Sequence, residues 1–182
     1  TQYSSEYMEV ASYNGESVSR ISFKKGFAVT DLATEPLKRG NKRTGTVVHW
    51  LPDLEVFTDI NIPREFFEDT LKKQSVVNPK IRFILEWQNP EGEFEHSEYY
   101  YENGIIDYVN EITGGESLTA PVSWHLETSG RDRDDKEDYR LKADIAFCFS
   151  NTVSRIEYYH NSSFLEHGGS PDKAVRLSFV YS

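Results

Sequence analysis

The stretch from residue 44 to residue 57 constrains the fold more than any other part of the chain. Small residues, Thr44-Gly45-Thr46, lead into the apolar run Val47–Leu51, which Pro52-Asp53 stops before a second short apolar segment. This pattern predicts a buried strand followed by a turn, with the first residues of the strand at a tight, ligand-facing edge. No residue in the stretch is an obvious catalyst, so its chemistry is expected to be contributory.

Composition limits the classes of protein to consider. The 182 residues suffice for one domain or two small ones, and 11 Tyr, 11 Phe and 3 Trp can build a core. The net charge of −10 argues against a free-standing binder of nucleic acid or anionic membranes, although a local basic patch stays possible. The single cysteine, Cys148, excludes an intrachain disulfide and favours a reduced, cytoplasmic setting. The start at Thr1, without Met, indicates an excised segment.

Apolar periodicity and turn sequences predict an α+β protein with two blocks of antiparallel strands. The expected strands are residues 7–13, 17–23, 44–51, 81–87, 94–100, 120–128, 139–149 and 154–159. The expected helices are residues 63–75, capped by Asp59 or Asn61, residues 101–112, and a last one that begins at Ser170. Asn14-Gly15 is the strongest hairpin signal. Gly114-Gly115 marks the expected domain boundary.

Two charged runs and the histidines give no catalytic signature by themselves. The basic run Lys38–Arg43 indicates either a solvated loop or a flexible arm that a phosphate ligand or a partner orders. The run 130–138 mixes both signs of charge and matches no calcium loop, which favours a solvated hairpin loop. The five histidines match no standard zinc signature, so no metal ligand is expected.

Four segments carry motifs whose order along the chain is informative. They are Glu6–Val10 with the hairpin that follows, Thr44–Phe57, Tyr100–Val109, and Asn161–Arg176 around Gly168-Gly169. Together they resemble the ATPase subunit of type IIA DNA topoisomerases, that is, the gyrase B or topoisomerase IV B type of chain. The resemblance covers nearly the whole chain, although the family's N-N-I and G-G-T-H motifs are Asn161-Ser162-Ser163 and Gly168-Gly169-Ser170-Pro171 here.

The resemblance implies a fold and a division of the chain. Residues 1–115 are expected to be the C-terminal half of a GHKL (Bergerat) ATP-binding domain, which is an α/β sandwich. Residues 116–182 are expected to be the N-terminal part of a transducer domain, which has a ribosomal S5 domain 2-like fold. The chain would then join part of a nucleotide pocket to a lever.

The resemblance also implies roles for three residues. Thr46 is expected to join the hydrogen-bond network that holds the adenine of ATP, and Val48 to line the same pocket. Strand alternation puts these two side chains on one face, which agrees with the roles that the resemblance implies. Arg176 is expected to contact DNA in the hole between transducer domains. Each has a plainer interpretation, as an ordinary strand residue or a surface arginine.

The parent enzyme implied by the resemblance is an ATP-hydrolysing DNA topoisomerase, an isomerase that uses ATP and Mg²⁺. Its partners would be DNA, the gyrase A or topoisomerase IV A type of chain, and a second copy of itself, with no membrane contact. In the family, the general base, the Mg-binding Asn and the glycine-rich lid lie upstream, and the phosphate-reaching Lys lies downstream. The isolated chain is therefore expected to be inactive, with no catalytic residue and no bound cofactor.

Two other interpretations stay open at this point. The first is a non-enzymatic acidic binding module, rich in aromatic residues and β-structure, that holds a protein or glycan through Tyr99-Tyr100-Tyr101 or Trp87. Exposed aromatic side chains would favour it, whereas core packing of the same residues would not. The second is another GHKL ATPase, of the mismatch-repair or chaperone type, which the Trp50–Phe57 pattern disfavours.

Overall fold

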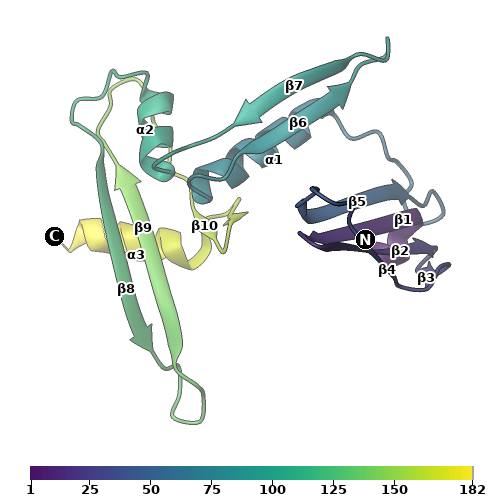
Figure 1. Ribbon diagram of the computed structural model, residues 1–182. Coiled ribbons are helices and arrows are strands. Elements are labelled where there is room, and N and C mark those ends of the chain that lie inside the picture. The colour runs from purple at the N-terminus through teal and green to yellow at the C-terminus, as the bar shows by residue number, and fades with distance from the viewer. Residues whose placement is uncertain (182) are drawn as a thin grey trace. The chain divides into compact units, whose positions relative to one another are not determined.

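The computed structural model describes residues 1–181 and divides into two compact units (Figure 1). The first unit is residues 1–62 and the second begins at Pro63. The expected α+β class is confirmed. The expected boundary after Gly114-Gly115 stays a prediction.

The first unit is built on one antiparallel sheet. Its strands are β1 (Ser5–Asn14), β2 (Ser17–Lys24), β3 (Phe27–Ala28), β4 (Ala33–Pro36) and β5 (Thr44–Pro52), after a short 3₁₀ helix, Gln2–Ser4. The order across the sheet is β3-β2-β1-β5, and β4 also pairs with β2. Strand β5 is therefore an edge strand that pairs with β1 alone.

The predicted hairpin at Asn14-Gly15 is confirmed. The side-chain oxygen of Asn14 accepts hydrogen bonds from the backbone N–H groups of Glu16 and Ser17, at 3.0 and 2.8 Å. Gly15 has φ +95°, a conformation that glycine adopts without strain. This turn sets the register in which Val10 faces Ile21 across β1 and β2.

Two expectations for the first unit are wrong. The stretch 27–43, expected to lack strands, contains β3 and β4, because β2 offers its second edge to both. Strand β5, expected to be buried, has exposed side chains, and Val48 is 53% exposed. The cause is that the unit is one sheet whose only helix is the single turn Gln2–Ser4, so no second layer within it covers β5.

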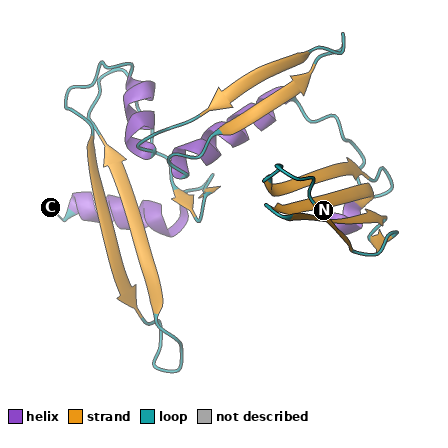
Figure 2. Cartoon of the chain, in the orientation of Figure 1, coloured by secondary structure: helices purple, strands orange, loops and turns teal. Residues whose placement is uncertain are grey.

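The second unit combines three helices with three hairpins (Figure 2). Its helices are α1 (Arg64–Val77), α2 (Ile105–Thr113) and α3 (Gly169–Val180). Its strands are β6 (Phe83–Gln88), β7 (Phe94–Tyr99), β8 (Val122–Gly130), β9 (Tyr139–Phe147), β10 (Tyr159–His160) and β11 (Ser163–Phe164). Each hairpin pairs consecutive strands. The three predicted helices are thereby confirmed to within a few residues.

The core of the second unit lies where α1 meets α2. Val76, Tyr101 and Tyr108 are buried together, and Ile105 and Ile112 pack against them. The predicted apolar face of α2 is thus confirmed. Helix α1 also lies along the β6–β7 hairpin, where Phe67 contacts Trp87 with ring centroids 5.7 Å apart.

The β8–β9 hairpin is a long two-stranded ribbon with two unlike faces. Register pairs Val122 with Phe147 and Trp124 with Ile145 on one face. On the opposite face, Glu127 forms ion pairs with Arg140 and Lys142. Helix α3 covers part of the apolar face, since the rings of Phe147 and Phe179 meet edge to face at 6.3 Å.

Two further local expectations for the second unit are wrong. A strand was expected over residues 154–159, but residues 153–158 form no strand, and only Tyr159 belongs to one, β10. The expected cap of α1 by Asp59 or Asn61 is also absent. The Asp59 carboxylate instead accepts a hydrogen bond from the backbone N–H of Asn61, at 2.8 Å. Pro63 stands at the N-cap, where its lack of an N–H costs nothing.

Candidate functional site: one face of the first sheet

Strand β5 begins with a backbone conformation that selects glycine. Gly45 has φ +113°, and a Cβ atom at this position would meet no other atom within 4 Å. Conformation, and not lack of space, therefore explains the glycine. Thr44 and Thr46 therefore flank a residue with no side chain on this edge strand.

The register places a row of small hydroxyl side chains across the sheet. Thr46 on β5 lies opposite Ser12 on β1, and Ser12 lies opposite Ser19 on β2. Ser19 in turn pairs with Thr34 on β4, and their hydroxyl oxygens are 2.8 Å apart. We call Thr46, Ser12, Ser19 and Thr34 the hydroxyl row.

Apolar side chains follow the hydroxyl row on the same face. Val48 lies opposite Val10, which lies opposite Ile21. The next pair of residues is Trp50 and Met8, and the Trp50 ring meets Phe57 edge to face at 6.0 Å. Each row lies about 7 Å from the one before, as strand geometry requires. The face thus changes from polar to apolar along the strands.

Such a face suits a flat ring that has polar atoms on one edge. Hydroxyl groups can donate or accept hydrogen bonds, and the valine row offers apolar contact to the body of a ring. The structure brings Thr46 and Val48 onto this face. Their contact with adenine stays a prediction.

The turn after β5 holds a buried carboxylate that sequence reasoning missed. Asp53 is 4% exposed and accepts a hydrogen bond from the N–H of Glu55 at 2.9 Å. Lys25 lies 3.7 Å from Asp53 and also pairs with Glu6 and Glu55. The hydrogen bond to Glu55, ahead of the nearby charges, raises the pKa of Lys25. In the sequence, the only sign of this charged cluster was the end of the apolar run at Pro52-Asp53.

Arg176, the predicted DNA contact, lies on the exposed side of α3. Its Nε donates to both carboxylate oxygens of Asp172, one turn earlier, at 2.9 Å. That hydrogen-bonded pair raises the pKa of Arg176 and lowers the pKa of Asp172. The side chain is 67% exposed, which leaves it accessible to a partner.

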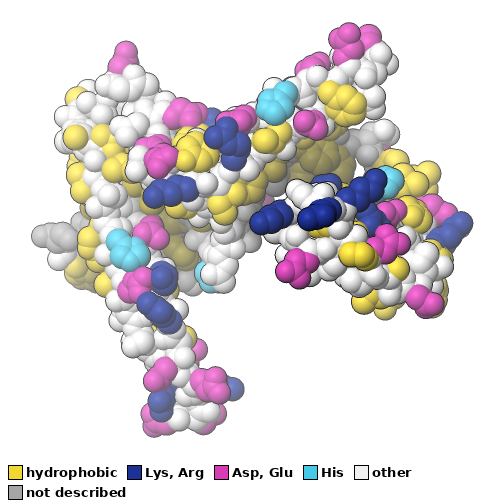
Figure 3. All heavy atoms as spheres, viewed as in Figure 1, with side chains coloured by type: hydrophobic (Ala, Val, Ile, Leu, Met, Phe, Trp, Pro, Cys, Tyr) yellow, Lys and Arg dark blue, Asp and Glu magenta, His cyan; other side chains and the backbone are white. Residues whose placement is uncertain are grey.

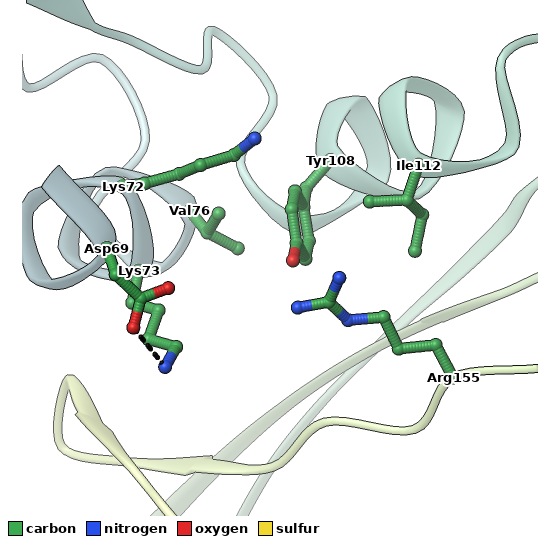
Figure 4. A pocket seen from close by; sticks show the side chains of 7 residues that line it. All are labelled: Asp69, Lys72, Lys73, Val76, Tyr108, Ile112 and Arg155. Carbon is green, nitrogen blue, oxygen red and sulfur yellow. Dashed lines mark hydrogen bonds and ion pairs between the residues drawn. The ribbon is translucent and has the colours of Figure 1, made fainter. Parts of the chain in front are cut away.

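A cavity of about 180 Å³ lies beside the core of the second unit (Figure 4). Its lining includes Lys72, Lys73 and Arg155, and the hydroxyl of Tyr108 points toward the Arg155 guanidinium. Burial raises the pKa of Tyr108 to about 12. Carboxylates already pair all three cations: Glu111 at 2.5 Å from Lys72, Asp69 at 2.6 Å from Lys73, and Glu157 beside Arg155. The cavity is therefore a charge-paired junction, and none of its lining comes from β5.

Residues 1–181 contain no group of three or more His, Cys, Asp or Glu side chains that could hold a metal ion. Among the same residues, none of the helices has the length and apolar character needed to cross a bilayer.

Comparison with known proteins identifies similar sequences over nearly the whole chain. The B subunit of DNA gyrase from rice chloroplasts and mitochondria is 26% identical over 179 residues, 97% of this chain and 24% of the relative. The DNA gyrase B chain of Enterococcus faecalis is 26% identical over 95% of this chain and 25% of the relative. The type 2 topoisomerase B chain of Aquifex aeolicus is 29% identical over 91% of this chain and 19% of the relative.

A solved structure is similar in fold. The 43K ATPase domain of Thermus thermophilus gyrase B, in complex with an aminocoumarin, matches 73% of this chain and 35% of that one, with a TM-score of 0.56 and 18% identity. No family model matches the sequence. The chain spans about a quarter of the length of the first two relatives. The resemblance drawn from the four motifs is confirmed, and most of this chain is similar in fold to about a third of the gyrase B ATPase domain.

Proposed function

We propose that this chain, which is similar to the B chains of DNA gyrase over nearly its whole length, is a segment of an ATP-dependent type II DNA topoisomerase. The observation that carries the proposal is similarity over 91–97% of this chain to such proteins in three unlike sources. The parent enzyme would pass one DNA duplex through another, with ATP hydrolysis to drive the cycle.

The first role of the segment would be to supply part of the adenine pocket. Thr46 would hydrogen-bond the network around the polar edge of the ring, and Val48 would contact the body of the ring. The hydroxyl row and the valine row support this assignment, because they put the two chemistries side by side on one exposed face.

The second role would be to connect the nucleotide site to the transducer. We assign residues 1–115 to the ATP-binding domain and residues 116–182 to the transducer. Gly114 supports a break there, since it ends α2 in the left-handed conformation with φ +58°. Tyr108 donates a hydrogen bond to Glu157 at 3.1 Å, so the joint would include a contact across the boundary. Arg176 would face DNA on the transducer side.

The cofactors and partners follow from the parent enzyme. ATP with Mg²⁺ would bind to the parent, with metal ligands outside this segment. DNA, the gyrase A or topoisomerase IV A type of chain and a second copy of the parent would be its partners in the cytoplasm. The catalytic groups for hydrolysis would also lie outside residues 1–182, so the isolated segment would be inactive.

The alternative, a non-enzymatic binding module, is not favoured. It required exposed aromatic side chains in the stretch 99–101 and at Trp87. Tyr101 is 8% exposed and belongs to the core, and Trp87 is half-buried against Phe67. Of the four aromatic side chains, Tyr100 alone is exposed, at 38%. These aromatic side chains serve mainly to pack the second unit.

Nucleotide binding by the parent protein tests the proposal. We expect Thr46→Val to weaken binding of a non-hydrolysable ATP analogue roughly 10- to 100-fold, because one hydrogen bond in a network contributes about 1–3 kcal/mol. Val48→Ala should weaken it less. Val47→Ala is the matched control, since Val47 lies on the opposite face of β5 with 43% exposure. Calorimetric titration measures all three.

Two results would contradict the proposal. One is equal loss of affinity in the Val47 and Val48 variants, which would mean that the face makes no specific contact. The other comes from the reading frame around this segment. A helix with Glu and Asn upstream and a Gln-Thr-Lys loop downstream are expected, whereas a stop codon and a signal peptide would favour the binding module.

A further inference from the structure

Five cations at one end of the first sheet have no carboxylate partner. They are Arg20, Lys38, Arg39, Lys42 and Arg43, and we call them the basic patch. Within residues 1–181, the only other Lys or Arg side chains without a carboxylate within 4.0 Å are Lys80, Lys136 and Lys173. Figure 3 shows dark blue side chains gathered on this unit. Positive charge is therefore left unneutralised at one place on an acidic chain.

Backbone hydrogen bonds fasten the loop that carries the patch. At its start, the N–H of Leu37 donates to the carbonyl of Glu16 at 2.7 Å. At its end, the N–H of Gly15 donates to the carbonyl of Arg43 at 3.0 Å. A turn closes between them, from the N–H of Asn41 to the carbonyl of Lys38. The loop is therefore anchored to the β1–β2 turn at both ends, unlike the flexible arm considered from the sequence.

An aromatic ring holds two of the cations in place. The guanidinium of Arg43 lies 4.3 Å from the centroid of the Tyr13 ring, and that of Arg20 lies 5.8 Å away. Arg20 also donates a hydrogen bond to the Tyr13 hydroxyl at 3.2 Å. Cation–π contact orders the guanidinium groups without neutralising them. Their charge stays available to a ligand.

The acidic residues of the same region do not neutralise the patch. Glu16 and Glu35 are the nearest carboxylates along the chain, and neither forms an ion pair. Five cations against two carboxylates leave a local positive surplus. The chain as a whole has a net charge of −10, so this surplus is segregated from the rest of the molecule.

We propose that the basic patch binds the phosphate backbone of duplex DNA. The choice of DNA as the polyanion rests on the proposed function. The chemistry of the patch agrees with it, since Arg and Lys on a fixed loop contact phosphates without reading bases. The loop segment 38–43 has no apolar side chain to insert into a bilayer, which disfavours a membrane surface. An acidic protein is the remaining competitor.

The proposal predicts how strongly the affinity for DNA depends on salt concentration. Each phosphate that a cation neutralises contributes about −0.9 to the slope of log K against log salt concentration. Five contacts predict a slope of roughly −4 to −5, which corresponds to a loss of affinity of roughly 10²–10³-fold between about 50 and 200 mM salt. Binding should not depend on base sequence.

Fluorescence anisotropy of a labelled duplex, titrated with the 182-residue chain at several salt concentrations, tests the proposal. The patch variant K38A/R39A/K42A/R43A should reduce the slope to about −1, because only Arg20 remains. The milder variant R39A/K42A keeps both Tyr13 contacts and should reduce the slope by about 2. The control R131A/R133A/K136A/K173A loses the same charge from sites elsewhere and should keep the wild-type slope.

Several outcomes would overturn the proposal. Equal slopes for the patch and control variants would show that only net charge matters. Tighter binding to poly-L-glutamate or to phosphatidylserine vesicles than to the duplex would assign the patch to an acidic protein or to a membrane. No duplex binding by the wild type, while Thr46→Val still weakens nucleotide binding in the parent, would remove the patch assignment and leave the proposed function intact. The reverse pair of results would keep the patch assignment and remove the adenine-pocket role of Thr46.

Discussion

Asp53 shows how one residue fixes the end of a strand. Its backbone carbonyl accepts hydrogen bonds from the N–H groups of Val56 and Phe57, at 3.0 and 2.9 Å. Its carboxylate bonds the N–H of Glu55 and faces Lys25. Lys25 occupies the left-handed region, with φ +47°, which costs a non-glycine residue some strain. The charge contact with Asp53 helps to hold it there.

We expect Asp53→Asn to lower the free energy of unfolding by about 1–2 kcal/mol. Asn keeps the acceptor for the Glu55 N–H but loses the negative charge of the buried carboxylate that lies 3.7 Å from Lys25. A hydrogen bond to a charged group contributes more than one to a neutral group. Urea denaturation measures the change. Glu55→Gln is the control, since the Glu55 side chain is 79% exposed and an exposed pair contributes little. A larger effect for Glu55→Gln than for Asp53→Asn would contradict this account.

Sequence alone reached some of these residues and missed others for a physical reason. Asn14-Gly15 was predictable because its turn chemistry is local, contained within four residues. The pairing of Lys25 with Asp53 joins residues far apart in the chain, and no periodic pattern records it. Thr46 and Val48 were placed on one face by alternation, whereas the hydroxyl row also needed the register of three other strands.

At the scale of elements, the contact between α1 and α2 organises the second unit. Val76, near the end of α1, is 1% exposed and packs against Tyr108 of α2. The Tyr101 hydroxyl donates to Glu111 at 2.5 Å, and Lys72 of α1 pairs with the same carboxylate. Burial raises the pKa of Glu111, but these two hydrogen bonds outweigh it and lower that pKa overall. Apolar packing and a shared carboxylate thus join the two helices.

We expect Val76→Ala to destabilise the second unit by roughly 2–3 kcal/mol. The change removes two buried methyl groups and leaves a small cavity in a core that has few buried residues. Leu118→Ala is the matched control, because Leu118 is 63% exposed and should change stability by about 0.5 kcal/mol or less. Denaturant unfolding followed by circular dichroism of the helical signal compares the two. Equal losses would show that Val76 is not at the centre of the core.

Elements with their own periodicity were predictable, and elements made by pairing were not. The apolar spacing of α1 and α2, and the alternation of β8 and β9, appear directly in the sequence. Strands β3 and β4 form because β2 offers a free edge, so their short segments show no pattern of their own. The exposure of β5 also escaped prediction, since an apolar run looks the same whether or not another layer covers it.

Across the whole molecule, charge is distributed unevenly, and the net charge does not show this. The net charge of −10 argued against a free-standing binder of nucleic acid, yet five unpaired cations gather at one end of the first sheet. Most other cations form ion pairs, as on the polar face of the β8–β9 hairpin. Net charge sets the long-range field, whereas phosphate contact depends on local clusters. A chain can therefore be acidic overall and still present a surface for DNA.

The isolated chain should not hydrolyse ATP. Hydrolysis requires a positioned water, a group that orients it and a cation that neutralises the developing charge on the phosphates. The resemblance places those groups outside residues 1–182. We expect phosphate release with ATP and Mg²⁺ to equal the buffer background, while the parent protein releases phosphate under the same conditions. Turnover by the pure chain that needs Mg²⁺ and falls in the Thr46→Val variant would show that the segment has a complete catalytic site.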